Sequence, residues 1–252
     1  MSRDRLKTKS IDYDEVSKVY DNVRIGDPEM IHHLLQGAVL QKESLVLDVG
    51  CGTGNNTVLF TKASHANVIG LDLSFGMLTK ANEKSKRIPL VQASADAIPF
   101  ADDTIRLAFM TEVIHHLPAS YRTVSEIYRT LVHGGSLCIV TQSHAQIEGR
   151  MTSRFFPASA DIDKKRYPEI GVIEKFLLRA GFFNLDSVVY QFKKTKLGAD
   201  YLETVENRGY SMLHKISRED YEKGVQDLRD AFSSGEELTY SPGYTFVWAA
   251  KQ

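Results

Sequence analysis

Residues 45–57, LVLDVGCGTGNNT, combine a short apolar run, an acid and three glycines at alternate positions. The apolar run predicts a buried strand, and the polar series after the last glycine predicts a helix. Glycine adopts backbone angles that other residues avoid and lets a ligand approach the main chain closely. In open parallel sheets, ligands bind at the carboxyl ends of strands, where the next helix directs its free N–H groups at them. The stretch therefore predicts a ligand site directly after this strand.

The spacing of the glycines separates two kinds of cofactor. Dinucleotide-binding folds use G-x-G-x-x-G, which brings a pyrophosphate onto the helix N-terminus. Here Gly50, Gly52 and Gly54 form G-x-G-x-G, and Asn55 takes the place of the third dinucleotide glycine. Asp48 lies just before the loop, where its carboxylate would repel a pyrophosphate and attract an ammonium group. The loop thus favours a ligand that has an amine and no phosphate.

Two more acids follow the next two expected strands. Asp72 closes the second strand, 22 residues after Gly50, and an acid at that end can accept hydrogen bonds from both ribose hydroxyls. Asp96 follows the third strand, where a side-chain acceptor could reach the exocyclic amine of an adenine. An amino acid, a ribose and an adenine in that order describe S-adenosylmethionine.

Strands and helices alternate along much of the chain. Expected strands cover residues 44–50, 66–74, 88–94, 104–110, 134–142, 184–192 and 244–251, and expected helices start at Asp27, after Ser74 and at residues 118 and 167. This order predicts right-handed crossovers and a parallel sheet with helices on both faces. Residues 195–235 are polar and helical in character. The last strand lacks a preceding crossover helix of ordinary length.

Composition limits the classes of partner. Of 252 residues, 42% are hydrophobic and 25% are charged, and the net charge is −1. Nucleic acid and anionic membranes are therefore disfavoured as partners. No apolar run approaches the roughly 18 residues of a membrane helix, and the charged stretch MSRDRLKTKS at the start is unlike a signal peptide. Cys51 and Cys138 lie in or beside apolar runs and do not suggest a disulfide, so a cytoplasmic location is expected.

The chain resembles the class I S-adenosylmethionine-dependent methyltransferases. The resemblance is strongest to the branch that includes ubiquinone and menaquinone methyltransferases and many small-molecule enzymes. It is carried by VLDVGCGTGNNT, VIGLDLS, ASADAIPFADDTIRLAFMTEVIHHL and LVHGGSLCIVTQS, which together cover roughly residues 44–143. The resemblance implies an α/β, Rossmann-like sheet of seven strands with helices on both faces and an antiparallel last strand.

The resemblance also implies the contacts to S-adenosylmethionine. By position, Asp48 would lie near the methionine amine, Asp72 on the ribose, and Asp96 with Ala97 at the adenine. Met77 either packs on the adenine or fills the core. The full set of expected cofactor-binding residues is Tyr20, Asp48, Gly50, Cys51, Gly52, Thr53, Asp72, Leu73, Met77, Asp96, Ala97 and Thr111.

The reaction centre has its own candidates. Thr111 and Glu112 would lie under the sulfonium. His116 is a candidate catalytic residue, because histidine titrates near neutrality; the alternative is that His115 and His116 simply end a strand. Tyr20 is the second candidate, as part of a lid over the cofactor, with ordinary packing as the alternative. Methyl transfer needs positioning and exclusion of water, and needs a base only if the nucleophile carries a proton. No metal site is expected.

The expected organisation is a single methyltransferase domain over residues 1–252. An N-terminal lid segment would cover residues 1–40, and helical insertions at about 143–167 and 193–240 would face the acceptor. A solvated connector is the alternative for residues 143–167. The expected function is methyl transfer to a small-molecule acceptor. The alternatives are a tRNA or protein methyltransferase of the same fold, or a non-catalytic nucleotide-binding module. The sequence predicts neither the acceptor atom nor the oligomeric state.

Overall fold

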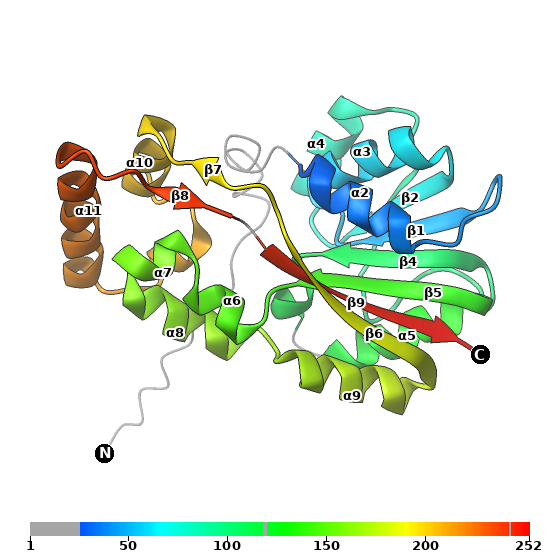
Figure 1. Ribbon diagram of the computed structural model, residues 1–252. Coiled ribbons are helices and arrows are strands. Elements are labelled where there is room, and N and C mark those ends of the chain that lie inside the picture. The colour runs from blue at the N-terminus through cyan, green and yellow to red at the C-terminus, as the bar shows by residue number, and fades with distance from the viewer. Residues whose placement is uncertain (1–25, 118–119, 242) are drawn as a thin grey trace, which may run out of the picture.

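A seven-stranded mixed sheet forms the centre of the molecule. The computed structural model describes residues 26–117, 120–241 and 243–252 (Figure 1). The strands are β1 (Leu45–Val49), β2 (Asn67–Asp72), β3 (Leu90–Gln92), β4 (Ile105–Thr111), β5 (Leu131–Thr141), β6 (Phe182–Gln191) and β9 (Gly243–Lys251). Their order in the sheet is β3-β2-β1-β4-β5-β9-β6. Only β9 pairs antiparallel, with β5 and β6, so the expected fold is confirmed.

Helices cover both faces of this sheet (Figure 1). On one face lie α2 (Pro28–Gly37), α3 (Asn55–Ser64) and α4 (Phe75–Lys84), and on the other lie α5 (Ser120–Thr130) and α9 (Ile170–Ala180). Each face has its own apolar core: Leu34, Phe60 and Phe109 are fully buried on the first, and Ile127 and Leu177 on the second. The buried strands β1 and β4 are therefore apolar on both sides, as central parallel strands require.

Three predicted helix ends are confirmed. The side chain of Asp27 accepts a hydrogen bond from the backbone N–H of Met30 at 2.9 Å, with Pro28 as the first helical residue. Ser74 caps α4 in the same way through the N–H of Met77 at 3.1 Å. Gly181 ends α9 with a left-handed φ of 105°, which glycine adopts without steric strain.

A helical cap lies beyond the carboxyl ends of the central strands (Figure 1). It contains α6 (His144–Glu148), α7 (Met151–Phe155), α8 (Pro157–Arg166), α10 (Ala199–Glu206), the 3-10 turn η2 (Ser211–His214), α11 (Arg218–Ser233), and the short strands β7 (Thr195–Lys196) and β8 (Thr239–Tyr240). The cap has an apolar core of its own, in which Phe156, Val205 and Leu228 are fully buried. Residues 143–167 are thus packed helices and not a solvated connector.

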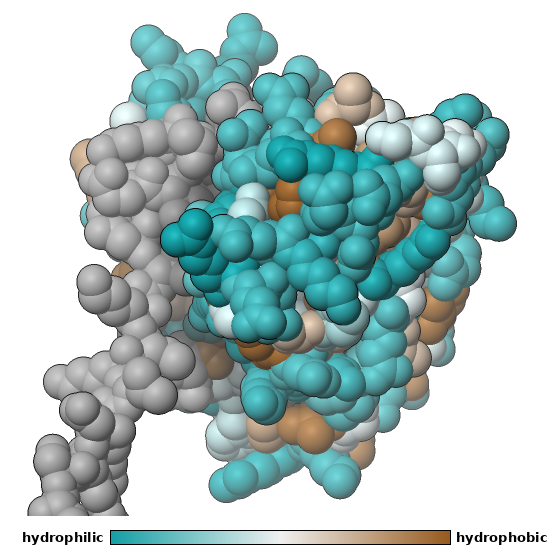
Figure 2. Space-filling model, turned by 90° about the vertical axis from the view of Figure 1, so that its left-hand side faces the viewer, coloured by the Kyte–Doolittle hydropathy of each residue, from teal (hydrophilic) through white to brown (hydrophobic). Residues whose placement is uncertain are grey.

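The outer surface of the cap contrasts with its core. Seen from the cap end of the molecule, the described surface is mainly hydrophilic, with small separate hydrophobic areas (Figure 2). Within the described parts of the chain, no helix combines the length and apolar character needed to cross a membrane.

The expected lid segment divides into two parts. Residues 28–37 form α2, and its inner residues Met30, Ile31 and Leu34 are buried against the sheet. Residues 1–25, which include the expected lid residue Tyr20, lie outside the described residues.

A substitution at Gly224 in α11 would test how tightly the cap is packed. A Cβ atom there would lie 2.3 Å from the ring of the buried Phe156 and 2.5 Å from the Phe155 carbonyl oxygen. We expect Gly224→Ala to lower the free energy of unfolding by about 1–3 kcal/mol, the usual effect of overpacking. The matched control is Gly171→Ala in the first turn of α9, where a Cβ would meet no described atom within 4 Å. That variant should be neutral or stabilising by up to about 1 kcal/mol. Urea denaturation measures both, and equal effects would contradict the packing argument.

Candidate functional site

The glycine loop after β1 has the conformation that its spacing predicts. Gly50, Gly52 and Gly54 have φ angles of 76°, 54° and 76°, in the left-handed region that favours glycine. A Cβ on Gly50 would lie 2.6 Å from the side chain of Val113, whereas a Cβ on Gly52 would meet no atom of the described residues within 4 Å. The first glycine therefore permits close packing against the residues after β4. At the second, no described residue fills the space above the loop.

Asp48 is a buried acid, and one of its two carboxylate oxygens lacks a hydrogen-bond partner among the described residues. It is the last residue but one of β1 and is 1% exposed. The Oδ2 atom accepts a hydrogen bond from the hydroxyl of Thr57 at 2.7 Å, while Oδ1 has no hydrogen-bond partner among the described residues. Burial, with a smaller contribution from the charge of Asp72, raises the pKa of Asp48 to about 7. A buried polar atom without a partner is costly, so Oδ1 points to a ligand that donates hydrogen bonds.

Asp72 joins the end of β2 to the glycine loop. Its Oδ2 atom accepts the backbone N–H of Gly52 at 2.8 Å, and Oδ1 accepts the N–H of Ser74 at 2.9 Å. The neighbouring Leu73 is 68% exposed, although it is a large apolar residue. An acid that fixes the loop, followed by an exposed apolar side chain, fits a ligand with a polar sugar and an apolar ring.

Hydrogen bonds to β2 and α4 hold the remaining loop residues in place. Thr53 is buried, and its carbonyl oxygen accepts a hydrogen bond from Lys84 Nζ at 2.9 Å. Cys51 is partly buried, and its N–H donates to the carbonyl of Leu71 at 2.9 Å. Burial raises the pKa of the Cys51 thiol, so this thiol stays protonated and is a poor nucleophile.

Other expected cofactor residues lie at the ends of β3 and β4 and on α4. Asp96 accepts a hydrogen bond from the hydroxyl of Ser94, and the exposed Ala97 follows it. Thr111 ends β4, and its hydroxyl accepts a hydrogen bond from Asn56 Nδ2 at 3.1 Å. Met77 is 2% exposed, which agrees with the alternative that it fills the core.

The sheet brings these residues together. Strands β3, β2, β1 and β4 are consecutive neighbours, and all run parallel. The segments that follow their carboxyl ends therefore share one edge of the sheet. The described residues from the expected set that lie near the carboxyl ends of these strands or follow them are Asp48, Gly50, Cys51, Gly52, Thr53, Asp72, Leu73, Asp96, Ala97 and Thr111.

Comparisons with known proteins agree with this geometry. A family model described as a methyltransferase domain matches residues 47–139. Over 96% of its length the chain is 24% identical to malonyl-[acyl-carrier protein] O-methyltransferase of Legionella pneumophila, of which it covers 87%. It is 30% identical over 86% of its length to the chloroplastic 2-methyl-6-phytyl-1,4-hydroquinone methyltransferase 2 of Oryza sativa, of which it covers 60%. A crystal structure from Anabaena variabilis, described as a methyltransferase from an antibiotic biosynthesis pathway, superimposes with a TM-score of 0.74 at 16% identity, covering 91% of this chain and 99% of that one.

Residues 47–139 form a methyltransferase domain of the class I S-adenosylmethionine-dependent type. The matched segment begins in β1 and ends in β5. It therefore contains the glycine loop and every strand that contributes to the edge described above. The cap lies outside the matched segment.

A contact between the sheet and the cap of this methyltransferase was not expected from the sequence. Tyr167 follows α8 and is 6% exposed. Its hydroxyl donates a hydrogen bond to Glu112 Oε2 at 3.0 Å, and its ring stacks on His115 with centroids 3.7 Å apart. Burial, with the charge of Glu112, raises the pKa of Tyr167 well above its ordinary value. The phenol therefore remains a hydrogen-bond donor at neutral pH.

A buried arginine supports this contact. Arg150 donates from Nε to Gln142 Oε1 at 2.7 Å and from Nη1 to Asp163 Oδ2 at 2.6 Å, and its guanidinium carbon lies 5.2 Å from the centroid of the Tyr167 ring. Asp163 also pairs with Arg166 at 2.9 Å. The only hint in the sequence is that residues 143–167 mix aromatic residues with arginines.

His116, the expected catalytic histidine, lies at the same junction. It ends the 3-10 turn η1 (Ile114–His116) and is exposed. Arg166 Nη2 donates to His116 Nδ1 at 3.3 Å, which connects η1 to the cap. The structure thus places His116 beside the candidate site, and its catalytic role stays a prediction. The described residues contain no group of three or more His, Cys, Asp or Glu side chains arranged to hold a metal ion.

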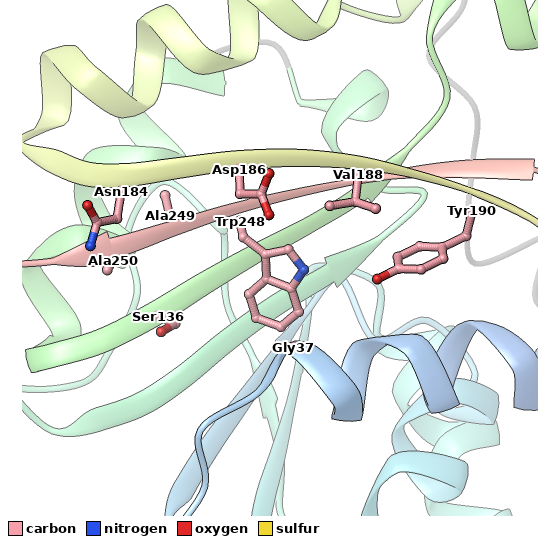
Figure 3. Close-up of a pocket in the computed structure, with 9 residues that line it drawn as sticks. All are labelled: Gly37, Ser136, Asn184, Asp186, Val188, Tyr190, Trp248, Ala249 and Ala250. Carbon is pink, nitrogen blue, oxygen red and sulfur yellow. The ribbon is translucent and has the colours of Figure 1, made fainter.

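A shallow pocket elsewhere in the methyltransferase is separate from this site. It has a volume of about 260 Å³ and is lined by Gly37, Ser136, Asn184, Asp186, Val188, Tyr190, Trp248, Ala249 and Ala250 (Figure 3). The indole of Trp248 lies against Gly37 at the end of α2, where a Cβ would come within 2.4 Å of the ring. The pocket lies toward the opposite sheet edge, at β9 and β6, and contains none of the residues expected to bind the cofactor.

Proposed function

We propose that this methyltransferase transfers the methyl group of S-adenosylmethionine to a small-molecule acceptor. The observation that carries the proposal is the buried oxygen Asp48 Oδ1, which has no hydrogen-bond partner among the described residues. The carboxylate would accept hydrogen bonds from the ammonium group of the methionine moiety. No described residue occupies the space above Gly52, so that moiety would have room there beside the main chain.

The other expected residues fit the rest of the cofactor. Asp72, which accepts the N–H groups of Gly52 and Ser74, would also accept hydrogen bonds from the ribose hydroxyls. The exposed side chain of Leu73 and the Asp96–Ala97 segment would contact the adenine. When bound, the cofactor supplies a methyl group that is already activated on a sulfonium. The task of the chain is then to orient the acceptor and exclude water.

The relatives limit the chemistry of the acceptor. Their names give a malonyl group attached to an acyl-carrier protein and a phytyl-substituted hydroquinone as substrates. Both molecules carry oxygen-bearing head groups on long substituents. The cap would face such an acceptor, because it lies over the carboxyl ends of the central strands (Figure 1).

We also propose a cytoplasmic location and a lid role for residues 1–25, with Tyr20 against the cofactor. The location is supported by the two free thiols of Cys51 and Cys138, which are typical of a reducing compartment. Both proposals remain predictions.

A labelling experiment tests the function. The protein is incubated with S-adenosylmethionine that carries a labelled methyl group and with separate pools of reduced quinones, acyl thioesters, tRNA and protein. We expect label only in the small-molecule pools, identified by mass spectrometry, and much less label with Asp48→Ala. The matched control is Asp186→Ala, an exposed acid on β6. Label only in tRNA or protein would contradict the small acceptor, and label in no pool would contradict methyl transfer.

A further inference from the structure

The first turn of α3 connects the glycine loop to two central strands. Thr57 donates from its hydroxyl to Asp48 Oδ2 at 2.7 Å. The preceding residue, Asn56, donates from Nδ2 to the hydroxyl of Thr111 at 3.1 Å, and Thr111 is the last residue of β4. One helical turn thus contacts both the buried acid of β1 and the hydroxyl at the end of β4.

The orientation of the Asn56 amide follows from its other partner. The backbone N–H of Asp27 donates to Asn56 Oδ1 at 3.0 Å, and a backbone N–H can only donate. The oxygen of the amide must therefore face Asp27, so its NH₂ group must face Thr111. The NH₂ group also lies 3.8 Å from the sulfur of the buried Met30, which is a weak acceptor. Asn56 is thus fixed as a donor to the Thr111 hydroxyl.

This arrangement keeps the proton of the Thr111 hydroxyl available. A hydroxyl has one proton to donate and two lone pairs that accept, and Asn56 uses one of the lone pairs. Among the described residues, none accepts a hydrogen bond from the Thr111 hydroxyl. Donation from the amide also polarises the hydroxyl and makes it a stronger donor. A ligand beside the half-buried Thr111 would therefore meet an O–H group, which requires an oxygen or nitrogen acceptor.

The hydroxyl lies beside the start of the glycine loop. In the sheet, Asp48 pairs with Phe109, two residues before Thr111, and a Cβ on Gly50 would touch Val113, two residues after it. Residues two apart on a strand point to the same face of the sheet. Phe109 and Thr111 therefore both point to the face that α3 covers, which agrees with the contacts of α3 to Asp48 and Thr111.

The methionine moiety of S-adenosylmethionine has two opposite charges to satisfy. Its ammonium group would be bound by Asp48, as proposed above, and its carboxylate needs hydrogen-bond donors. The sulfonium is a cation and would repel the hydroxyl proton of Thr111, whereas the carboxylate would accept it. The N-terminus of α3 favours a negative charge nearby, and its N-cap residue, Gly54, has no side chain that could take this position.

We propose that Thr111 donates its hydroxyl proton to the carboxylate of the methionine moiety, and that Asn56 is a positioning residue that keeps this proton available. This inference rests on the proposed function. Two consecutive residues of α3 then serve the two charges of one amino acid. Thr57 acts on the ammonium group through Asp48, and Asn56 acts on the carboxylate through Thr111.

A pair of ligands tests the contact to the carboxylate. S-adenosylmethionine and its decarboxylated form have the same amine, sulfonium, ribose and adenine, and only the first has the carboxylate. We expect the wild type to bind S-adenosylmethionine about tenfold or more tightly than the decarboxylated form in calorimetry, as one hydrogen bond to a charged group implies. Thr111→Val removes the hydroxyl at nearly constant shape and should abolish most of this preference by weakening S-adenosylmethionine alone. Thr111→Ser keeps a hydroxyl and should keep the preference.

A second variant tests the positioning role. In Asn56→Asp the new side chain still accepts the N–H of Asp27, but both of its oxygens are acceptors. The Thr111 hydroxyl would then donate to this carboxylate, so the preference for S-adenosylmethionine should fall about tenfold. The matched control is Asn184→Asp, which adds the same charge at an exposed residue of β6 and should leave the preference unchanged (Figure 3).

A double variant separates this effect from direct charge repulsion. The charge added by Asn56→Asp would also act on the ligand carboxylate through space, whether or not Thr111 is present. In the Thr111→Val background, Asn56→Asp should change the preference by less than about twofold, because residues that act through one contact are not additive. Circular dichroism shows that each variant is folded.

The outcomes separate this inference from the proposed function. Equal affinity of the wild type for the two ligands would overturn the inference, as would a preference that folded Thr111→Val retains. An effect of Asn56→Asp that persists in the Thr111→Val background would overturn the positioning role. In each case, label transferred to a small molecule would leave the proposed function intact. Failure to label any pool would defeat the proposed function instead, and the comparison of the two ligands would still decide the roles of Thr111 and Asn56.

Discussion

Replacement of Asp48 by asparagine is expected to stabilise the cofactor-free protein at pH 8 relative to the wild type. Burial raises the pKa of Asp48 from 3.8 to about 7, so between these values the folded state binds a proton that the unfolded state has lost. A group with a raised folded-state pKa contributes stability that is complete below pH 3.8 and is lost as the pH rises through 7. The asparagine side chain does not ionise, so it adds no such pH dependence to the free energy of unfolding.

The size of the effect follows from the pKa. Each unit of pKa difference corresponds to about 1.4 kcal/mol. Between pH 5 and pH 8, the stability of the variant should therefore rise relative to the wild type by about 3 kcal/mol. Urea denaturation at several pH values measures this difference. A constant difference across the range would show that Asp48 is ionised in the folded protein at pH 5.

The same substitution should have the opposite effect on cofactor binding. An ammonium group pairs with the charged form of Asp48, so binding below pH 7 must first release the proton. Wild-type affinity for S-adenosylmethionine should then fall about tenfold per pH unit below 7, and the affinity of Asp48→Asn should be weaker and nearly independent of pH. Calorimetry in buffers of different ionisation enthalpy detects the released proton. Asp186→Asn, at an exposed acid on β6, serves as the control, and a flat wild-type profile would contradict the assignment.

Local sequence patterns predicted the part of the protein that is built from local contacts. The cap of α4 by Ser74 spans three residues, and the left-handed angles at Gly50, Gly52 and Gly54 are ones that glycine adopts readily. The parallel sheet was expected from the alternation of strands and helices with right-handed crossovers, whereas the order of the strands is seen only in the structure. Asp48 and Asp72 lie near the ends of β1 and β2 and Asp96 follows β3, and parallel strands end at one edge of the sheet, so their juxtaposition could be predicted from sequence alone.

Contacts that depend on how the cap packs could not be predicted in this way. Tyr167 and Glu112 are 55 residues apart, and nothing in the sequence near either residue indicates the other. The strands β7 and β8 are two residues long, too short to show an alternating pattern. Likewise, β5 begins at Leu131, three residues before the expected start at 134, because α5 runs into the strand without a loop.

The role of Asp72 in the glycine loop was also not visible in the sequence. The residue was expected to contact the ribose, yet in the structure it accepts the N–H groups of Gly52 and Ser74. Which N–H groups it reaches depends on the left-handed turn at Gly52, and only the folded loop shows that geometry. The consequence is that one carboxylate orders the loop and is expected to bind the ligand.

Asp72→Ala should therefore lose more cofactor affinity than a ribose contact alone would explain. Loss of the ribose acceptor and of the bond that fixes Gly52 should together weaken S-adenosylmethionine binding by about 3 kcal/mol, or roughly 100-fold, since hydrogen bonds to charged groups contribute about 1.5–3 kcal/mol each. Its demethylated product should be weakened equally, because both molecules carry the same ribose.

The fold should survive this substitution, because Asp72 ends its strand and β2 keeps its pairing with β1 and β3. Calorimetry with both ligands and circular dichroism of the variant provide the measurements. Asp186→Ala is the matched control, since the sheet order places β6 at the edge opposite to β3 and β2. Asp72→Asn keeps one acceptor but turns an NH₂ group toward a backbone N–H, so it should restore little of the affinity. If folded Asp72→Ala bound both ligands as tightly as the wild type, neither the ribose contact nor the ordering of the loop by this carboxylate could stand.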